Sequence, residues 1–477
     1  MSDRMQLSIS AQLGRRPTDL RQMKRTCLFL VAVLALVAAT ACQTGVQMWA
    51  SCTAPDGSIE SGTDGTYVLV CSNGRWTPIM TVDEYIRRSQ GQDVPIAPLP
   101  SPPTTTTSAP TTVPTTTSTT PTTSTTVPPL VVGADEVTGG QQFSCALIDG
   151  AVSCWGRNNR GQLGDGTTTP SSVPVSTGIT NAVDVDAGME HACALRVDGT
   201  VACWGNNHYG MVGGGGDATS PRTVSGVADA VGIGVGQFHS CALLRSGAVK
   251  CWGHNAQGQL GTGSFDSTSF PTAVSGISDA VELSLGGSHT CARRSTGAVA
   301  CWGNGGNGEL GNGSTASSNV AVVVTGISNA VDVGLGDWYS CAVLADGTAR
   351  CWGYNGEGEL GDGTTTSAST PVPVDGLTGA TKITGGVRHT CAAVATGVRC
   401  WGVNGNGELG DGTTTASSSP VTVLVVGAVA DLDAGLSHTC AITSGDVVRC
   451  WGANGNGQLG DGTTTSSSTP VGVTGLS

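Results

Sequence analysis

The stretch CALRVDGTVACWG, residues 193–205, decides the fold of this chain. It places Cys193 and Cys203 on either side of an Asp-Gly pair, and near copies of it occur seven times in the sequence. Two cysteines at this spacing could bind a metal, form part of a catalytic site or close a β-hairpin. The role of the cysteine pair determines how the whole repeat array is interpreted.

The copy CALIDGAVSC, residues 145–154, favours a hairpin closed by a disulfide. A two-residue Asp-Gly turn is typical of type I′ hairpins, and counting outward from residues 149–150 brings Cys145 directly opposite Cys154. Opposed residues of an antiparallel pair have Cβ atoms about 4.5–5.5 Å apart, close enough for a disulfide after slight adjustment. Five copies hold one more residue, which a three-residue turn with a bulge absorbs. The predicted hairpin disulfides are Cys145–Cys154, Cys193–Cys203, Cys241–Cys251, Cys291–Cys301, Cys341–Cys351, Cys391–Cys400 and Cys440–Cys450.

The metal and catalytic interpretations of these cysteines are weaker. A structural zinc site usually needs cysteines two to four residues apart, and this chain has no such pair. A catalytic thiol would have to be free, and seven repeated sites do not suit one nucleophile. We therefore expect no catalytic residue, no metal and no cofactor.

A histidine precedes the first cysteine by two residues in five copies, whereas Phe143 and Tyr339 hold that place in the other two. Because a metal ligand is not replaceable by Phe or Tyr, we expect these side chains to pack or to form hydrogen bonds. The five histidines are His191, His239, His289, His389 and His438.

From residue 131 the chain repeats with a period of 48–50 residues, which is typical of a propeller or a solenoid. The copy at residues 329–376 contains four predicted strands, NAVDVGLG, WYSCAVL, ARCWG and PVPVDGL, and four short strands are the make-up of a propeller blade. A tryptophan follows every second cysteine, and we expect it to pack within its blade. These residues are Trp155, Trp204, Trp252, Trp302, Trp352, Trp401 and Trp451.

Each copy continues into a glycine-rich loop such as NGNGQLGDGTTT, residues 454–465. Four copies match G-x-G-x-x-G, but a nucleotide fingerprint needs a following helix, and a Thr/Ser tract follows here. Recurring aspartates raise the possibility of calcium, yet Gly214, Thr262 and Asn312 take their place in other copies. We therefore expect turn formation, in which Gly, Asn and Asp are favoured. The aspartates are Asp165, Asp362, Asp411 and Asp461.

The segment MKRTCLFLVAVLALVAATAC, residues 23–42, has a basic start and an apolar run too short for a comfortable membrane span. It predicts a signal segment, with Met23 as a candidate true start. The residues before Cys42 fit ordinary signal peptidase, and they also resemble a bacterial lipobox, although Ala39 stands where that motif usually has Leu. If Cys27 is removed and Cys42 is lipidated, an even number of cysteines remains. We expect a bacterial cell-surface lipoprotein, with a secreted protein as the alternative.

The sequence predicts four parts. Residues 1–41 are the signal segment, and residues 42–92 form a small unit that a Cys52–Cys71 disulfide staples, since so small a core needs one. Residues 93–130 are a Thr/Pro-rich linker that we expect to be disordered or extended, as a stalk. Residues 131–477 hold the repeats.

The repeats resemble the regulator-of-chromosome-condensation repeat family, on the pattern HTCALxxDGxVxCWGxNxxGQLGxGT, and most of all its bacterial exported, alpha-tubulin suppressor-like branch. Only the second copy, with MVGGGGDAT at residues 211–219, departs clearly from the pattern in its loop. The resemblance implies an all-β, seven-bladed β-propeller, closed by pairing an N-terminal strand with C-terminal strands. The sequence ends at PVGVTGLS, and the strand due next, ADEVTGG (134–140), stands at the start of the array.

The charge of the chain limits its partners. The formal net charge is −13, and no cluster of Lys and Arg is present for phosphate binding. Nucleic acid is therefore not expected as a partner, and we expect membrane contact only through the lipid anchor. The founder of the family exchanges nucleotide on a nuclear GTPase and binds chromatin, a role that needs basic surfaces this chain lacks.

The leading functional hypothesis is a non-enzymatic, monomeric cell-surface binding or adhesion module that displays a propeller on a stalk, with a protein or glycan as ligand. The alternative is a secreted inhibitor of an extracellular enzyme, which exposed aromatics on one face, such as Phe238, Trp338 and Tyr339, would favour. A propeller-based lyase or hydrolase ranks lower, because it would need carboxylates or histidines that converge in the central channel. A guanine-nucleotide exchange factor ranks last, since fold alone does not determine function.

Overall fold

The chain divides into two compact units, Met1–Thr122 and Thr123–Ser477. The computed structural model describes residues 59–61, 67–72, 75–81, 134–424, 426–443 and 447–476. The described part of the first unit is a three-stranded antiparallel sheet in the order β1-β2-β3. Its strands are β1 (Ile59–Ser61), β2 (Tyr67–Ser72) and β3 (Arg75–Thr81).

Several predictions on the N-terminal part fall outside the described residues. The signal segment, Cys42 and the linker at 93–130 are among them, and so is Cys52, the expected partner of Cys71. These assignments remain predictions. Within the described ranges, no helix is both long and apolar enough to cross a membrane.

The second unit consists of seven four-stranded antiparallel sheets, each built from consecutive strands. Blade 1 contains β4 (Ala134–Gly139), β5 (Phe143–Ile148), β6 (Ala151–Gly156) and β7 (Ser171–Ser176). Blade 2 contains β8 (Ala182–Ala187), β9 (His191–Arg196), β10 (Val201–Gly205) and β11 (Ala218–Thr223). Blade 3 contains β12 (Ala230–Val235), β13 (His239–Leu244), β14 (Val249–Gly253) and β15 (Thr268–Ala273). Blade 4 contains β16 (Ala280–Leu285), β17 (His289–Arg294), β18 (Val299–Gly303) and β19 (Ser318–Val323).

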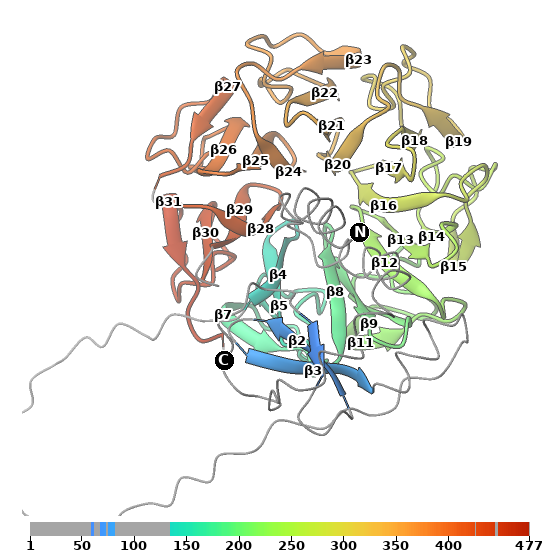
Figure 1. Ribbon diagram of the computed structural model, residues 1–477, viewed down its shortest axis with the longest axis vertical. Helices are drawn as coiled ribbons and strands as arrows, with labels where there is room; N and C mark the ends of the chain where they lie inside the picture. The colour runs from blue at the N-terminus through green and yellow to red at the C-terminus, as the bar shows by residue number, and fades with distance from the viewer. Residues whose placement is uncertain are drawn as a thin grey trace, which may run out of the picture. The chain divides into compact units, whose positions relative to one another are not determined.

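The remaining three sheets follow the same plan. Blade 5 contains β20 (Ala330–Leu335), β21 (Tyr339–Leu344), β22 (Ala349–Gly353) and β23 (Ala368–Pro373). Blade 6 contains β24 (Ala380–Gly385), β25 (His389–Val394), β26 (Gly397–Gly402) and β27 (Ser417–Thr422). Blade 7 contains β28 (Val429–Ala434), β29 (His438–Thr443), β30 (Val448–Gly452) and β31 (Ser467–Gly472). Figure 1 shows the seven sheets of this unit arranged in a ring, with the first strand of each blade toward the centre.

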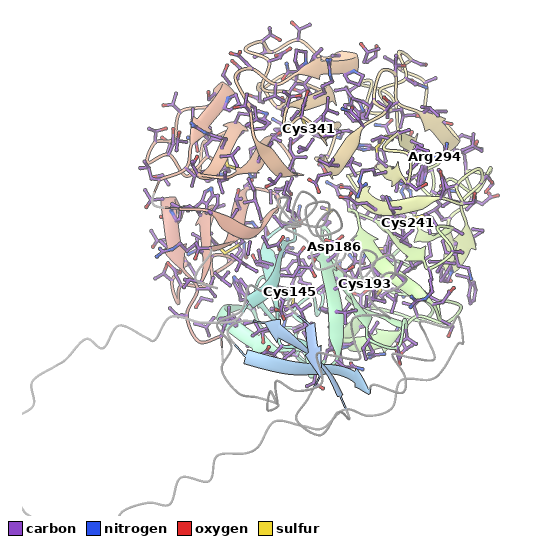
Figure 2. The ribbon with its side chains drawn as sticks, in the orientation of Figure 1. Cys145, Asp186, Cys193, Cys241, Arg294 and Cys341 are labelled. Carbon is purple, nitrogen blue, oxygen red and sulfur yellow. A yellow bond between two sulfur atoms is a disulfide. The ribbon has the colours of Figure 1, made fainter. Side chains whose placement is uncertain are left out.

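The predicted all-β, seven-bladed propeller with one Cys-paired hairpin per blade is confirmed. In every blade a disulfide joins the second and third strands, and the two Cα atoms lie 4.0 or 4.1 Å apart. The labels in Figure 2 mark the first cysteine of four of these pairs. Seven disulfides of this kind indicate an oxidising compartment.

Turn chemistry accounts for the hairpins. Asp149 and Gly150 both have positive φ, 49° and 82°, as a type I′ turn requires. In blade 2 the turn is one residue longer, and Gly199 takes a positive φ of 80° where the bulge forms. Because the amide of Arg196 still bonds to the carbonyl of Thr200, at 2.9 Å, the two cysteines stay opposed.

The fourth strand of blade 5 lies earlier than the sequence predicts. In blade 5 the prediction was residues 371–377, whereas β23 runs from Ala368 to Pro373 and Gly353 pairs with Ala368. The polar Ser/Thr tract belongs to the strand, because this outermost strand is only half buried and tolerates polar side chains on an edge. Its polarity had been interpreted as loop.

The predicted closure of the ring by a shared strand is wrong. Blades 1 and 7 are each complete, in the orders β4-β5-β6-β7 and β28-β29-β30-β31. The ring closes through contacts between whole blades: the amide of Val137 donates to Asp431 Oδ2 at 2.9 Å, and the indole of Trp155 donates to the carbonyl of Gln458 at 2.9 Å. Since each copy begins with the innermost strand, a copy makes one full blade and no strand needs to be exchanged.

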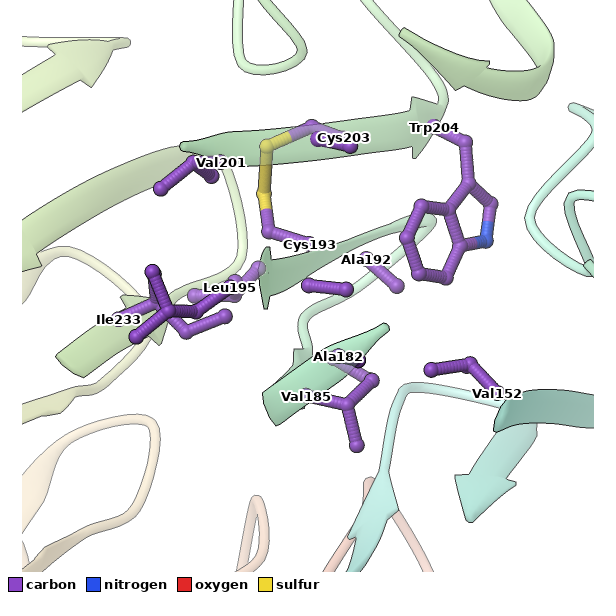
Figure 3. Close-up of a cluster of buried hydrophobic side chains, with 14 of the residues drawn as sticks. Val152, Ala182, Val185, Ala192, Cys193, Leu195, Val201, Cys203, Trp204 and Ile233 are labelled. Carbon is purple, nitrogen blue, oxygen red and sulfur yellow. A yellow bond between two sulfur atoms is a disulfide. The ribbon is translucent and has the colours of Figure 1, made fainter. Parts of the chain in front are cut away.

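The tryptophans link neighbouring blades as well as filling the core. Trp204 is completely buried, and its Nε1 donates to the carbonyl of Gln162, in the glycine-rich loop of the preceding blade, at 2.9 Å. Gly164 lies against the same indole with φ +68°, and a Cβ there would come within 2.8 Å of the ring. Figure 3 shows Trp204 beside the Cys193–Cys203 disulfide. A glycine at the position of Gly164 therefore allows the loop of one blade to pack against the tryptophan of the next blade.

The loop aspartates form turns, as the sequence predicts. Asp165 Oδ1 accepts hydrogen bonds from the amide of Thr167 at 2.9 Å and from Asn158 Nδ2 at 3.1 Å. Within the described residues, no group of three or more His, Cys, Asp or Glu side chains is placed to hold a metal ion.

Candidate functional site

Two loops of every blade lie on the same face of the propeller, which we call the loop face. Because the strands of a blade are antiparallel, the short loop after the first strand and the glycine-rich loop after the third strand emerge at the same end. In blade 3 these loops are residues 236–238 and 254–267.

One position from each of these two loops is tied to the other by a backbone hydrogen bond in every blade. In blade 3 the amide of His254 donates to the carbonyl of Phe238 at 2.8 Å. The flanking residues repeat from blade to blade, whereas the residues at these paired positions differ. The pairs, from blade 1 to blade 7, are Gln142–Arg157, Glu190–Asn206, Phe238–His254, Ser288–Asn304, Trp338–Tyr354, Arg388–Val403 and Ser437–Ala453.

The paired positions therefore combine a rigid backbone with variable side chains. Such a combination is typical of binding surfaces, where a scaffold holds loop side chains that carry function. Aromatic residues occupy two of the seven pairs, in blades 3 and 5, and each forms the centre of a cluster.

The first cluster, which we call the Tyr209 cluster, spans blades 2 and 3. The Tyr209 ring lies 5.5 Å from the Phe238 ring, 4.3 Å from the His254 ring and 4.6 Å from the His208 ring, measured between centroids. Burial lowers the pKa of His254, so this imidazole is neutral at neutral pH. Tyr209 remains 37% exposed.

The second cluster, the Trp338 cluster, spans blades 5 and 6. Trp338 and Tyr354 pack edge to face with centroids 5.8 Å apart, a favoured geometry for aromatic pairs. The guanidinium of Arg388 lies 5.5 Å from the Trp338 ring and forms an ion pair with Glu357 at 3.6 Å. A Trp, a Tyr and an Arg are thus presented together on the loop face.

The sequence placed Phe238 and Trp338 correctly among the partly exposed aromatics, but the expectation for Tyr339 is wrong. Tyr339 is completely buried, and its hydroxyl donates to the carbonyl of His389 at 2.5 Å. It begins β21 at the position of the buried histidines, so it points between blades. Tyr209 and His254 were not among the predicted residues; the signal for them is an aromatic side chain at a loop position that is polar in most copies.

The five histidines form hydrogen bonds between blades, as predicted. His191 Nε2 lies 2.9 Å from Ser240 Oγ of the next blade, and His438 Nε2 closes the ring at 2.8 Å from Ser144 Oγ. Ser144 Oγ donates its own proton to the carbonyl of Gln458, so Nε2 is the donor to Ser144. Burial lowers the pKa of His191 and His438 to about 3. These histidines are structural.

Carboxylates converge on the centre of the ring, where they accept hydrogen bonds from backbone amides on the first strand of a neighbouring blade. Asp332 Oδ2 accepts the amide of Ile383 at 2.7 Å, and Glu136 Oε2 accepts the amide of Val185 at 3.0 Å. These amides belong to innermost strands, whose exposed edges would otherwise leave donors unpaired. The alternation of carboxylate and apolar residues in the first strands was the signal for this arrangement.

Asp186 lies near the centre of the ring (Figure 2). Its Oδ2 accepts the amide of Val235 at 2.7 Å, and its Oδ1 accepts the amide of Ala187 at 2.8 Å. Burial, with a further contribution from Asp433, raises the pKa of Asp186 to about 8. A carboxyl with this pKa is largely protonated at neutral pH.

A cavity of about 450 Å³ opens beside the Tyr209 cluster. It exists because the loop of blade 2 departs from the repeat: Gly205 pairs with Ala218, whereas Gly253 of blade 3 pairs with Thr268, so the blade 2 loop is two residues shorter. The residues that line it are Arg160, Asn206, Asn207, His208, Tyr209, Gly216, Asp217 and Phe238.

Comparison with known proteins agrees with this architecture. Residues 101–392 match the model of the RCC1-like domain, and residues 429–458 and 448–477 match models of the regulator of chromosome condensation (RCC1) repeat. Human WBSCR16 is a similar solved structure, with 24% identity over 66% of this chain and 88% of that chain and a TM-score of 0.60. Yeast RCC1 (Prp20), solved bound to Kap60, shows 18% identity over 73% of this chain and 86% of that chain, with a TM-score of 0.61. No curated protein sequence matches the chain.

Proposed function

Because the chain belongs to the family of RCC1-like domains, we propose that it is an exported, non-enzymatic binding module that takes a protein partner on its loop face. The seven disulfides support an oxidising, extracellular setting. In that setting a nuclear GTPase is not available as a partner, so nucleotide exchange is not carried over from the founder of the family.

The observation that carries the proposal is the Trp338 cluster. Trp, Tyr and Arg are the residue types most enriched at the energetic centres of protein interfaces. Here the backbone bond between Trp338 and Tyr354 holds two of them in place before any partner binds, at 2.9 Å. Side chains that are ordered in advance lose little entropy on binding.

The centre of the ring supports a binding role more than a catalytic one. The carboxylates there accept backbone amides of neighbouring blades, as Asp332 and Glu136 do. The cavity at the mouth of the channel on the loop face measures about 80 Å³, well below the roughly 300–1,000 Å³ of typical ligand pockets. A lyase or hydrolase substrate would find little room there, and the carboxylates of Asp332 and Glu136 are already engaged with backbone amides.

A second candidate function, a secreted inhibitor of an extracellular enzyme, is favoured by the same aromatic residues. Inhibitors bind through rigid, preorganised surfaces that change little on association. Two aromatic clusters on one face suit such a surface. The two candidates differ in what the partner does after binding, since an adhesion partner keeps its activity and an inhibited enzyme does not.

We predict that Trp338→Ala weakens binding of the protein partner by at least about tenfold, because truncation of a central interface Trp typically removes 2 kcal/mol or more. The full-length chain is immobilised and exposed to extracellular extract, and retained proteins are identified and titrated by surface plasmon resonance. Ser288→Ala, at the equivalent position of blade 4, is the matched control and should bind as the parent does.

Equal retention by Trp338→Ala and Ser288→Ala would contradict the role of this cluster, and failure of the parent chain to retain any protein would contradict the proposed function. Adding the parent chain to the purified partner then separates the two candidates. Loss of the partner's catalytic activity supports the inhibitor, and its persistence supports adhesion.

We further propose that Cys42 is lipidated and that residues 93–130 act as a stalk between the anchor and the propeller. Mass spectrometry of the mature N-terminal peptide should show an acylated Cys42, and Cys42→Ser should release the protein into the medium. Cys27→Ser, inside the proposed signal segment, is the control and should leave the protein anchored. An N-terminal peptide with an unmodified cysteine would rule out the anchor in favour of secretion.

A further inference from the structure

We propose that the cavity beside Tyr209 is a binding site for a neutral saccharide. This site lies between blades 2 and 3 and is separate from the Trp338 cluster of blades 5 and 6. The proposal therefore does not depend on the protein partner.

The cavity is built into the fold. Asn207 holds the short blade 2 loop from within: its Nδ2 donates to the carbonyls of Gly213 and Gly215, both at 2.7 Å, and its Oδ1 accepts the amide of Val212 at 2.9 Å. Three bonds from one buried side chain keep the wall of the cavity in place. Its volume of about 450 Å³ falls within the usual range for small-ligand pockets, roughly 300–1,000 Å³.

Tyr209 supplies a platform for a sugar ring. Phe238, His254 and His208 pack around it, so the phenol is held in one orientation while 37% of the residue stays exposed. The face of an aromatic ring carries partial negative charge, which attracts the C–H groups on the apolar side of a pyranose. Every other blade has a polar or charged residue at this loop position, for example Arg160, Gln257 and Asn307.

Arg160 and Asp217 supply the polar contacts at the rim of the cavity. Their side chains form an ion pair at 3.5 Å and remain 52% and 38% exposed. A guanidinium offers several fixed donors and a carboxylate only acceptors, and a sugar hydroxyl both donates and accepts. One hydroxyl pair can therefore bind both groups at once.

The charge around the cavity selects a neutral ligand. Arg160 also faces Glu190, at 4.0 Å, and Glu190 is paired with Arg157 at 3.5 Å, so two cations and two anions balance. Burial lowers the pKa of His254, so its imidazole is neutral and adds no charge to the cavity. An anionic saccharide would meet Asp217 in the lining, and the guanidinium of Arg160 beside it already faces the carboxylates of Asp217 and Glu190. An apolar peptide side chain would meet a lining in which only Tyr209 and Phe238 present a hydrocarbon ring.

The test is isothermal titration calorimetry of the full chain with three neutral trisaccharides, maltotriose, cellotriose and N,N′,N″-triacetylchitotriose, at millimolar concentration. At least one should bind, and Tyr209→Ala should weaken it by about tenfold, the size expected for one aromatic stacking contact. Tyr209→Phe should retain most of the affinity, because stacking does not need the hydroxyl. Tyr354→Ala, in the other cluster, is the matched control and should bind sugar as the parent does.

Three outcomes would overturn the proposal: no binding of any neutral trisaccharide, equal binding by Tyr209→Ala in a protein that melts as the parent does, or tighter binding of the anionic sialyllactose or of an aromatic peptide. The retention experiment with Trp338→Ala tests the protein-binding function and is independent of the sugar titration. Loss of sugar binding alone leaves the protein-binding function standing, and loss of the protein partner alone leaves the saccharide site standing.

Discussion

Reduction of the blade disulfides is expected to unfold the propeller under conditions in which the oxidised protein is stable. Each disulfide closes a loop of about ten residues and contributes about 2.5–3 kcal/mol in the chain-entropy model. Whole proteins are stable by only about 5–15 kcal/mol, so seven such contributions exceed the total. The core cannot compensate, because apart from its tryptophans it consists mainly of Val, Ala and Leu (Figure 3).

The measurement is circular dichroism and thermal melting of protein that has been reduced in denaturant and then returned to buffer with reductant. Denaturant is needed because the disulfide cysteines are buried. Replacing the single pair Cys341 and Cys351 by Ala is the control and should lower stability by only about 3 kcal/mol. If the fully reduced chain refolds with the melting temperature of the oxidised one, the disulfides do not stabilise the blades.

Asp186→Asn is expected to make the propeller more stable than the parent at alkaline pH. Folding raises the pKa of Asp186 from 3.8 to about 8 by burial. The folded state therefore binds a proton that the unfolded state releases, and stability is fully present below pH 3.8 and is lost as the pH rises to 8. At about 1.4 kcal/mol per unit of pKa shift, the full loss is about 6 kcal/mol.

Asparagine suits this position. Its Oδ1 can accept the amide of Val235, as Asp186 Oδ2 does. The amide of Ala187, which Asp186 Oδ1 accepts, keeps a second acceptor in Thr138 Oγ1 at 3.1 Å. Thr138 can in turn accept from the Asn Nδ2 while it donates to Asp433. The substitution thus removes the charge and keeps the buried donors paired.

The pH range of the experiment is set by the histidines. His191, with a folded-state pKa of about 3, is neutral when folded and protonates when unfolded below pH 6.5. Its contribution therefore falls as the pH drops below 6.5, opposite to that of Asp186. Above about pH 7.5, one unit beyond the ordinary histidine pKa of 6.5, the histidines are almost entirely neutral in both states, so the slope up to pH 9 comes mainly from carboxyls.

Urea unfolding across pH 6.5–9 should show the parent losing about 2 kcal/mol to Asp186 over the first 1.5 units and Asp186→Asn losing less. Asp337, whose pKa burial raises to about 7, accounts for part of the slope that remains. His438→Phe, which copies the residue that blade 1 already has at Phe143, is the control and should change the profile only below about pH 7.5. Parallel profiles for the parent and Asp186→Asn would show that Asp186 is not the group that titrates.

The resemblance of the repeats to a known family led to one correct and one wrong expectation. The number of blades and their ring arrangement are confirmed. Closure by a shared strand is wrong, since the copy that begins at residue 134 starts with the innermost strand and makes a whole blade by itself. Where a repeat begins relative to the blade is a matter of strand order, and that order is visible only in the fold.

The sequence alone determined those features of this protein that depend on interactions between residues close together in the chain. The Asp149–Gly150 turn, the register that opposes Cys145 and Cys154, and the first three strands of a copy all depend on backbone geometry within a few residues. What only the tertiary structure decided is which side chains meet across blades. Tyr209 and His254 are 45 positions apart in the chain, and they touch because the blade 2 loop packs toward blade 3. Tyr339 and Trp338 are adjacent in the sequence, yet one is buried between blades and the other is presented on the loop face. The physical reason is that turns and strand pairing are local interactions, whereas exposure and clustering depend on how each blade packs against the next.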